Sequence, residues 1–192
     1  MNAMSRRSRR GFVTACIVVL LLAGAAFVWA LFGMVPSASG PACQVTIGSE
    51  KYSLDREQVT NALAITTVAS DLGLPHHAVT IAVAAALQES GLHNLDHGDR
   101  DSVGIFQQRP SQGWGTPTEL LQPRFAARAF LSRLVQIDGW QNLPLTVAAQ
   151  RVQRSATPNA YAKWEAEARA LARATTGEVT GALYCDTPIS SV

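Results

Sequence analysis

The feature that most constrains this chain is a run of ten residues with almost no polar side chain. Residues 78–87 comprise nine apolar residues and Thr80. A helix that is apolar on every side must be buried, because none of its faces can lie against water. At about 1.5 Å per residue it is too short to cross a bilayer. The sequence therefore predicts a central buried helix, with Pro75 at the first helical position, where a missing N–H is tolerated.

Amphipathic stretches predict the helices that enclose this run. One helix is expected to follow a cap at Ser53 and to end near Gly73. Helical spacing recurs in four further stretches: a capping box at residues 116–119, a stripe over residues 125–134 after Pro123, residues 145–153, and a last helix that opens at residues 157–158 and ends at Gly177.

The chain before these helices predicts a small β-hairpin. Val45 and Ile47 alternate with polar residues, residues 48–49 form a turn, and residues 51–52 begin the return strand. The predicted fold class is therefore mainly α, of the α+β type: a helical bundle around a central buried helix, with a small N-terminal β-hairpin. Residues 90–115 form a long irregular loop, and long ordered loops tend to carry function.

A second apolar stretch, near the N-terminus, is long enough to cross a membrane. Residues 12–32 hold no charged residue over 21 positions, which matches a bilayer and exceeds a usual signal-peptide core. Arginines precede it, so the positive-inside rule predicts a cytoplasmic N-terminus. The expected organisation is a basic segment 1–11, a signal anchor 12–32, a linker 33–42, an exported domain 43–187 and a tail 188–192. Cleavage near residues 37–39, which would secrete the domain, is the open alternative.

The net charge and the cysteines of the predicted exported part indicate what it binds and how it is stabilised. Four of the 16 basic residues lie before the apolar stretch, which leaves 12 against 14 acidic residues, a balance of about −2. That argues against nucleic-acid binding, which requires a basic patch, and suits a neutral polymer such as a glycan. Cys43 and Cys185 bracket the domain, and exported thiols tend to pair. We expect a disulfide between them; two free thiols are the alternative.

Glu89 is the first acidic residue after the apolar helix, and its place predicts an unusual carboxyl. Partial burial beside Leu87 and Leu92 disfavours the charged form, and so does the negative end of the helix dipole. Both effects raise the pKa, as a general acid that protonates a glycosidic oxygen requires. The alternative is an exposed residue that ends the helix before Ser90 and Gly91.

Two short motifs resemble those of the soluble lytic transglycosylase family of the lysozyme superfamily. The first is Glu89-Ser90-Gly91, and the second is the run Gly104-Ile105-Phe106-Gln107-Gln108-Arg109-Pro110. The family has a Glu-Ser pair, then Gly-Leu-Met-Gln followed after two residues by Pro. Its usual interval from the glutamate to that glycine is the one found here, 15 positions. The resemblance covers residues 74–172.

This resemblance implies a lysozyme-like fold in which Glu89 is the catalytic acid. It places Gln107 in the cleft as a sugar-binding residue, with Ser90 and Gln108 as further substrate-binding candidates. Trp114 is another candidate, because aromatic faces stack on sugars; capping the core is its alternative role. For the glutamines the alternative is ordinary loop polarity.

Two positions depart from the family's pattern. The family often has a serine nine residues after the glutamate, where this chain has Gly98. The family's Ala-Tyr-Asn-Ala-Gly motif, whose tyrosine contacts the acid, falls on residues 151–155 and puts Val152 in the tyrosine slot. Gln153 is a candidate to replace the asparagine, and Tyr161 is a candidate to reach the site from the last helix.

The implied mechanism needs one carboxyl. Glu89 protonates the oxygen between N-acetylmuramic acid and N-acetylglucosamine, and then acts as base on the muramic 6-hydroxyl to give a 1,6-anhydro product. The route requires no metal and no other cofactor. The predicted function is therefore a membrane-anchored enzyme that cleaves peptidoglycan glycan strands, with those strands and the membrane as its partners.

Three alternatives stay open in the sequence. If Asp96, Asp99 or Asp101 holds a water opposite Glu89, the enzyme is an inverting muramidase. The same aspartates, with histidines in the loop at positions 93 and 97, would otherwise bind a divalent cation, although their spacing is not that of an EF-hand, or simply pair with neighbouring arginines. Finally, Val152 in the tyrosine slot is what a non-catalytic wall-binding module would show.

Overall fold

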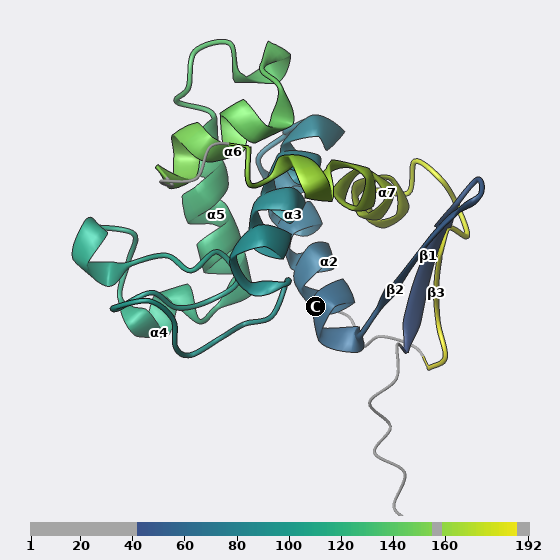
Figure 1. The fold of residues 1–192 in the computed structure, drawn as a ribbon, viewed down its shortest axis with the longest axis horizontal. Coiled ribbons are helices and arrows are strands. Elements are labelled where there is room, and N and C mark those ends of the chain that lie inside the picture. The colour runs from purple at the N-terminus through teal and green to yellow at the C-terminus, as the bar shows by residue number, and fades with distance from the viewer. Residues whose placement is uncertain (1–41, 155–158, 188–192) are drawn as a thin grey trace, which may run out of the picture. The chain divides into compact units, whose positions relative to one another are not determined.

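The chain is mainly helical with one small sheet. The computed structural model describes residues 42–154 and 159–187 (Figure 1). The expected membrane segment, most of the linker, the opening of the last helix at residues 157–158 and the tail lie outside these ranges. Within them, no helix is long and apolar enough to cross a membrane. The predicted fold class, a helical bundle around a buried helix with a hairpin, is confirmed.

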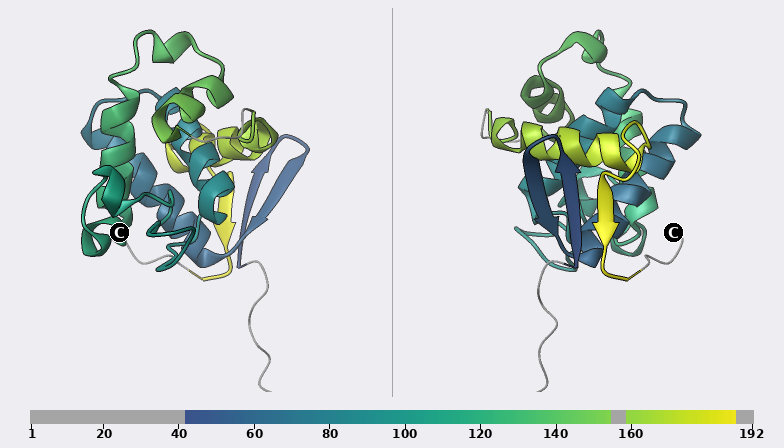
Figure 2. Two further views of the ribbon diagram at one scale, coloured as in Figure 1. Left: turned by 60° about the vertical axis from the view of Figure 1, so that its left-hand side comes forward. Right: turned by 90° about the vertical axis from the view of Figure 1, so that its right-hand side faces the viewer.

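Helix α3, His76–Ser90, is the centre of the fold. All of residues 78–87 are buried, as their apolar composition predicts. Pro75 is the N-cap residue, one position earlier than expected, and Gly91 ends the helix in the left-handed conformation with φ of 63°, which glycine adopts without strain. The helices that contact α3 are α2 (Arg56–Asp71), α5 (Pro123–Leu134), α6 (Leu145–Gln153) and α7 (Glu165–Thr175) (Figure 2).

One of the two predicted helix caps is confirmed, and the other is wrong. The predicted capping box at Thr116 is present and starts the short helix α4, Pro117–Leu120. Helix α2, however, is capped by Asp55 with Gln58, and not by Ser53. Ser53 is instead paired with Gln44 in the sheet, so its backbone is extended and cannot begin a helix two residues earlier. Helix α7 begins several residues later than predicted, after a 3-10 turn at Ala162–Trp164.

The sheet contains the predicted hairpin and one further strand. Strands β1 (Cys43–Ile47) and β2 (Glu50–Leu54) pair antiparallel, and β3 (Leu183–Cys185) pairs with the other edge of β1. The sheet contacts α7 (Figure 2). The third strand has only three residues, too few for an alternating pattern to reveal it.

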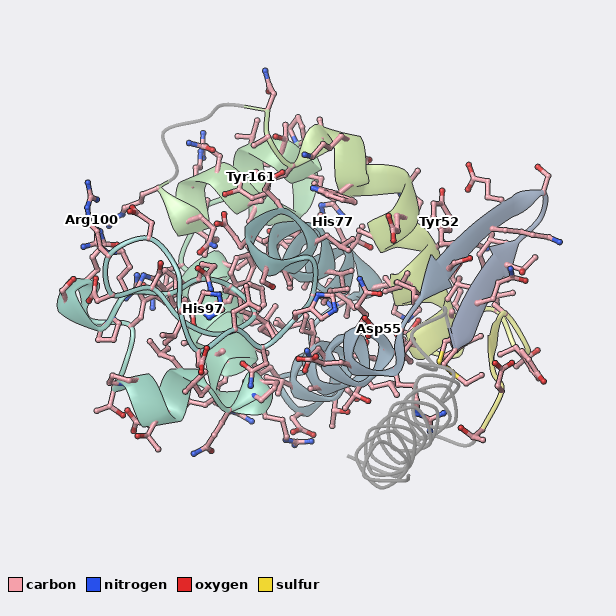
Figure 3. All side chains as sticks on the ribbon, turned by 60° about the horizontal axis from the view of Figure 1, so that its bottom comes forward. Tyr52, Asp55, His77, His97, Arg100 and Tyr161 are labelled. Carbon is pink, nitrogen blue, oxygen red and sulfur yellow. A yellow bond between two sulfur atoms is a disulfide. The ribbon has the colours of Figure 1, made fainter. Side chains whose placement is uncertain are left out.

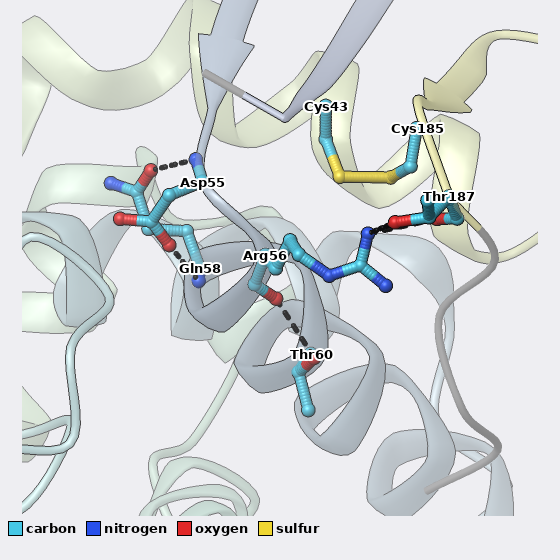
Figure 4. The surroundings of a disulfide bond; sticks show 7 residues. All are labelled: Cys43, Asp55, Arg56, Gln58, Thr60, Cys185 and Thr187. Carbon is cyan, nitrogen blue, oxygen red and sulfur yellow. Dashed lines mark hydrogen bonds between the residues drawn. A yellow bond between two sulfur atoms is a disulfide. The ribbon is translucent and has the colours of Figure 1, made fainter. Parts of the chain in front are cut away.

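The predicted disulfide joins Cys43 and Cys185, which lie opposite each other on β1 and β3 (Figure 4). Next to it, the Arg56 guanidinium of α2 donates to the Thr187 carbonyl at 2.9 Å. The bond closes a loop with a sequence separation of 142 residues. It therefore holds the two ends of the domain together, and in the chain-entropy model so long a loop gives a large stabilisation.

Replacing both cysteines (Cys43→Ala with Cys185→Ala) is expected to lower the free energy of unfolding by about 2–5 kcal/mol, because the uncrosslinked chain has more freedom when unfolded. Guanidinium denaturation followed by circular dichroism measures this. Wild type with reducing agent is the control and should reach the stability of the double variant. Equal stability of the oxidised wild type and the double variant would contradict the prediction.

Candidate active site

A cleft of about 790 Å³ opens beside the last turn of α3. Its walls come from the end of α3, from the long irregular loop, and from the ends of α5 and α6. Polar and charged side chains make up most of the lining. Its volume is in the range of ligand-binding clefts in proteins.

Glu89 lies in this cleft, on the last turn of α3. The hydroxyl of Tyr161 donates to its Oε1 at 2.9 Å. The Gln153 side chain, whose Nε2 donates to the Phe106 carbonyl at 2.9 Å, also lies in the cleft. Burial raises the pKa of Glu89 above its ordinary value, while Tyr161 and Gln153 act against that rise without cancelling it. The carboxyl is therefore held by Tyr161 and stays protonated to a higher pH than a free glutamate.

Tyr161 supplies the hydroxyl that the usual motif position lacks. Its side chain is fully buried and precedes the 3-10 turn that leads into α7. Val152, in the motif's tyrosine slot, is buried in the cleft wall and offers only an apolar surface. Tyr161 therefore reaches the acid from the start of the last helix, as expected. Gln153, the candidate to replace the asparagine, lines the same cleft as Glu89, and its Nε2 donates to the Phe106 carbonyl at 2.9 Å.

The two motif glutamines have different positions. Gln107 lines the cleft, and its Nε2 donates to the Gly104 carbonyl at 3.2 Å. Gln108 is only 2% exposed, does not line the cleft, and donates to the Ala126 carbonyl at 3.2 Å. The expectation that Gln108 binds substrate is therefore wrong. It pairs with Val103 across the tight turn of the loop, which directs its side chain into the core.

Ser90 connects the two motifs instead of facing the cleft. Its hydroxyl donates to the Ile105 carbonyl at 2.8 Å, which fastens the loop to the end of α3. It is not a lining residue, so its expected role in substrate binding is replaced by a structural one. Trp114 does line the cleft but is only 7% exposed, and the guanidinium carbon of Arg133 lies 3.3 Å from the centroid of its ring. That face of the indole is occupied by a cation.

The aspartates of the loop are dispersed among different partners. Asp101 accepts a hydrogen bond from Ser111 N and another from Arg109 Nε, each at 2.8 Å; these bonds, led by the backbone one, hold its pKa well below the usual range. Asp96 pairs with His97, and Asp99 lies 3.9 Å from the Arg100 guanidinium.

No group of three or more histidine, cysteine or acidic side chains within the described ranges is arranged to hold a metal ion. The other loop histidine, His93, pairs with the α2 cap Asp55 at 2.7 Å. The sequence left three roles open for the loop aspartates: holding a water, binding a cation, or pairing with arginines. The structure shows the third, most clearly between Asp101 and Arg109.

Sequence reasoning missed that four arginines line the cleft: Arg100, Arg109, Arg133 and Arg154. The exported part is slightly acidic overall, so its net charge gave no indication of a local cluster of arginines. One feature of the sequence could have indicated two of them. Arg133 and Arg154 stand at the C-terminal ends of two predicted helices, and helix ends are where a bundle presents side chains to a neighbouring loop.

No protein-family model and no curated protein matches the chain. The resemblance to lytic transglycosylases therefore rests on the two motifs and their interval. Any function must be argued from these residues and from the geometry around Glu89.

The variant Tyr161→Phe is expected to raise the pKa of Glu89 further, because the lost hydroxyl favours the charged carboxylate. A ¹³C NMR titration of the Glu89 carboxyl measures this. The matched control is Tyr184→Phe, since Tyr184 is 66% exposed on β3 and should leave the titration unchanged. A Glu89 pKa that stays constant or falls in Tyr161→Phe would show that the hydrogen bond does not act on the acid.

A methyl group at Gly98 is expected to displace the side chain of Gln107. The added Cβ would lie 1.8 Å from Gln107 Oε1, the mobile end of a flexible side chain, and 2.7 Å from Ser102 Oγ. Gly98→Ala should therefore cost only about 1 kcal/mol. A double-mutant cycle with Gln107→Ala should recover part of that cost. Strictly additive losses of stability would mean that the two side chains do not compete for this space.

Proposed function

We propose that this chain is an exported, membrane-anchored enzyme that cleaves the glycan strands of peptidoglycan as a lytic transglycosylase. The observation that carries the proposal is the environment of Glu89. A half-buried carboxyl with a raised pKa stands in a polar cleft, and the hydrogen bond from Tyr161 fixes its orientation. A general acid needs these properties: a pKa above that of a free carboxyl and a fixed direction. The resemblance to lytic transglycosylases, carried by the interval of 15 positions from Glu89 to Gly104, is a second support.

The lining of the cleft favours a mechanism with one carboxyl. Among the described lining residues, Asp99 is the only other carboxylate. Its side chain is 86% exposed on the loop, where water and salt weaken its influence. An inverting hydrolase needs a second carboxylate that holds a water in place. A solvated aspartate is poorly suited to that task, so the single-acid route is the better match.

In this route Glu89 transfers its proton to the glycosidic oxygen as the bond from that oxygen to the anomeric carbon breaks. The resulting carboxylate is stabilised by the hydrogen bond from Tyr161, and Gln153 also favours the charged form. It then takes the proton of the muramic 6-hydroxyl while that oxygen bonds to the anomeric carbon. Glu89 recovers its proton, and no water is consumed. Tyr161 thus supports the charged form that exists only between the two steps.

Tyr161 also bears on the choice between an enzyme and a binding module. The argument for a module was that Val152 cannot hydrogen-bond the acid. Tyr161 provides that hydrogen bond from a different element, close to α7. A site that only bound glycan would have no need of a buried tyrosine directed at a half-buried carboxyl, so this contact favours catalysis.

Replacing the acid tests the proposal directly. Glu89→Gln is expected to lower the release of muropeptides from purified peptidoglycan by roughly 10²–10⁴-fold, the usual contribution of a general acid. The matched control is Glu167→Gln on α7, since burial also raises the pKa of Glu167 but it does not line the cleft. Mass spectrometry should show 1,6-anhydro ends.

Wild-type activity should fall as the pH rises through the pKa of Glu89, because the acid must be protonated.

Other products would point elsewhere. Reducing ends in place of anhydro ends would mean that water is the acceptor and that the enzyme is a muramidase. If the wild-type protein sediments with peptidoglycan but releases nothing, the enzymatic proposal fails and a binding module remains. Equal activity of Glu89→Gln and wild type would remove Glu89 from the mechanism.

A further inference from the structure

Positive charge is concentrated in the cleft. Four arginines line it from three segments: Arg100 and Arg109 from the loop, Arg133 from the last turn of α5, and Arg154 from the C-cap of α6. Arg100 lies at the outer part of the loop (Figure 3). Among the described residues, only Glu89 and Asp99 bring carboxyl groups to the same space. The exported part as a whole has more acidic than basic residues, so this local excess is not a reflection of overall composition.

Two of these arginines have no counter-charge among the described residues. Arg109 is paired with Asp101 at 2.8 Å. Arg133 and Arg154, in contrast, form no ion pair with any described residue. Burial lowers the pKa of Arg133, and the positive charge of Arg154 lowers it further. The charges of these two residues therefore repel each other, and both residues line the same cleft.

The Arg133 side chain is held in place despite this repulsion. The Arg133 Nη2 donates to the Gly113 carbonyl at 3.0 Å, and its guanidinium stacks on the Trp114 ring. Most of its N–H donors stay available, since this is its only hydrogen bond to the described residues. Arg154 is exposed, and its backbone, which ends α6 with φ of 52°, is fixed by the bond from its N–H to the Gln150 carbonyl at 2.8 Å. The planar, pre-oriented guanidinium of Arg133 matches the oxygens of a carboxylate or a phosphate.

We infer that Arg133 and Arg154 form a subsite for an anionic substituent of the glycan strand, a carboxylate or a phosphate ester. This inference rests on the proposed function and names the substrate class more narrowly. The sugar hydroxyls and N-acetyl groups are neutral and do not offset two unpaired cations. Peptidoglycan strands carry carboxylates on their peptide substituents, and phosphate esters where other polymers are attached. An anion bound between the two arginines removes their repulsion, so substituted strands are the preferred substrate.

Binding in the absence of turnover tests the subsite. The whole chain, kept in mild detergent and carrying Glu89→Gln, is titrated with fluorescent glycan strands that bear peptides. The same strands are also used after an amidase has removed the peptides, and after hydrofluoric acid has removed phosphate esters. An uncharged N-acetylglucosamine oligomer is the neutral probe. Two double variants are compared: Arg133→Gln with Arg154→Gln, and the control Arg128→Gln with Arg151→Gln, on the same helices but outside the cleft.

The cleft variant is expected to bind the substituted strands roughly 10- to 100-fold more weakly, the size expected for one or two charge-assisted hydrogen bonds. The control variant should change by less than about threefold, and the neutral oligomer should bind all proteins alike. Loss of the preference after amidase treatment identifies a peptide carboxylate, and loss after hydrofluoric acid identifies a phosphate. Circular dichroism melting checks folding, and Arg154→Gln alone, at an exposed position, repeats the test where the double variant melts early.

Three results would overturn the subsite: equal weakening by both double variants, equal wild-type affinity for charged and neutral strands, or an unchanged preference in a folded cleft variant. These results are separate from the test of catalysis. Arginine-dependent binding by a protein that releases no muropeptides would leave the subsite standing and end the enzymatic proposal. Glu89-dependent cleavage without any arginine dependence would do the reverse.

Discussion

The free energy of this fold depends on enclosing α3, a helix that has no face suited to water. Its alanines are fully buried, and such small side chains let the neighbouring helices approach closely. The enclosure must end where the first polar residues appear. Glu89 comes at that boundary, so its carboxyl is partly desolvated by the same packing that stabilises the domain. The raised pKa is therefore a consequence of the core and needs no separate device.

The interval between the two motifs has an equally local cause. Ser90 Oγ donates to the Ile105 carbonyl, and these residues are separated by the same 15 positions as Glu89 and Gly104. An insertion or deletion between them would break this bond and move the loop away from the acid. Gly104 itself has φ of 80°, and an added Cβ would lie 2.4 Å from the Leu120 carbonyl oxygen. The glycine and the interval thus both serve to place the cleft wall opposite Glu89.

These two causes explain what could be predicted. The α3 core, the hairpin and the place of Glu89 each follow from local pattern, because one stretch of chain contains the whole signal. The disulfide could be predicted for a different reason: Cys43 and Cys185 are the only cysteines of the sequence after residue 32. Gln108 could not be predicted, since its direction depends on the turn paired with Val103. The N-cap of α2 was predicted at the wrong residue, because Ser53 is paired in strand β2 and Asp55 is the cap. Arg133 and Arg154 stand at the ends of two predicted helices, but only the packing of α5 against α6 brings them to one cleft.

The arginines and the acid must also be kept apart for the cleft to work as proposed. A guanidinium next to Glu89 would favour the carboxylate and lower its pKa, removing the proton that catalysis needs. The groups that set this pKa are the surrounding core, Tyr161 and Gln153, with no arginine among them. Tyr161, through its hydrogen bond, and Gln153 both favour the carboxylate, and neither side chain carries a net charge. The cleft therefore combines an acid held by neutral partners with a separate positive region, and one strand can engage both.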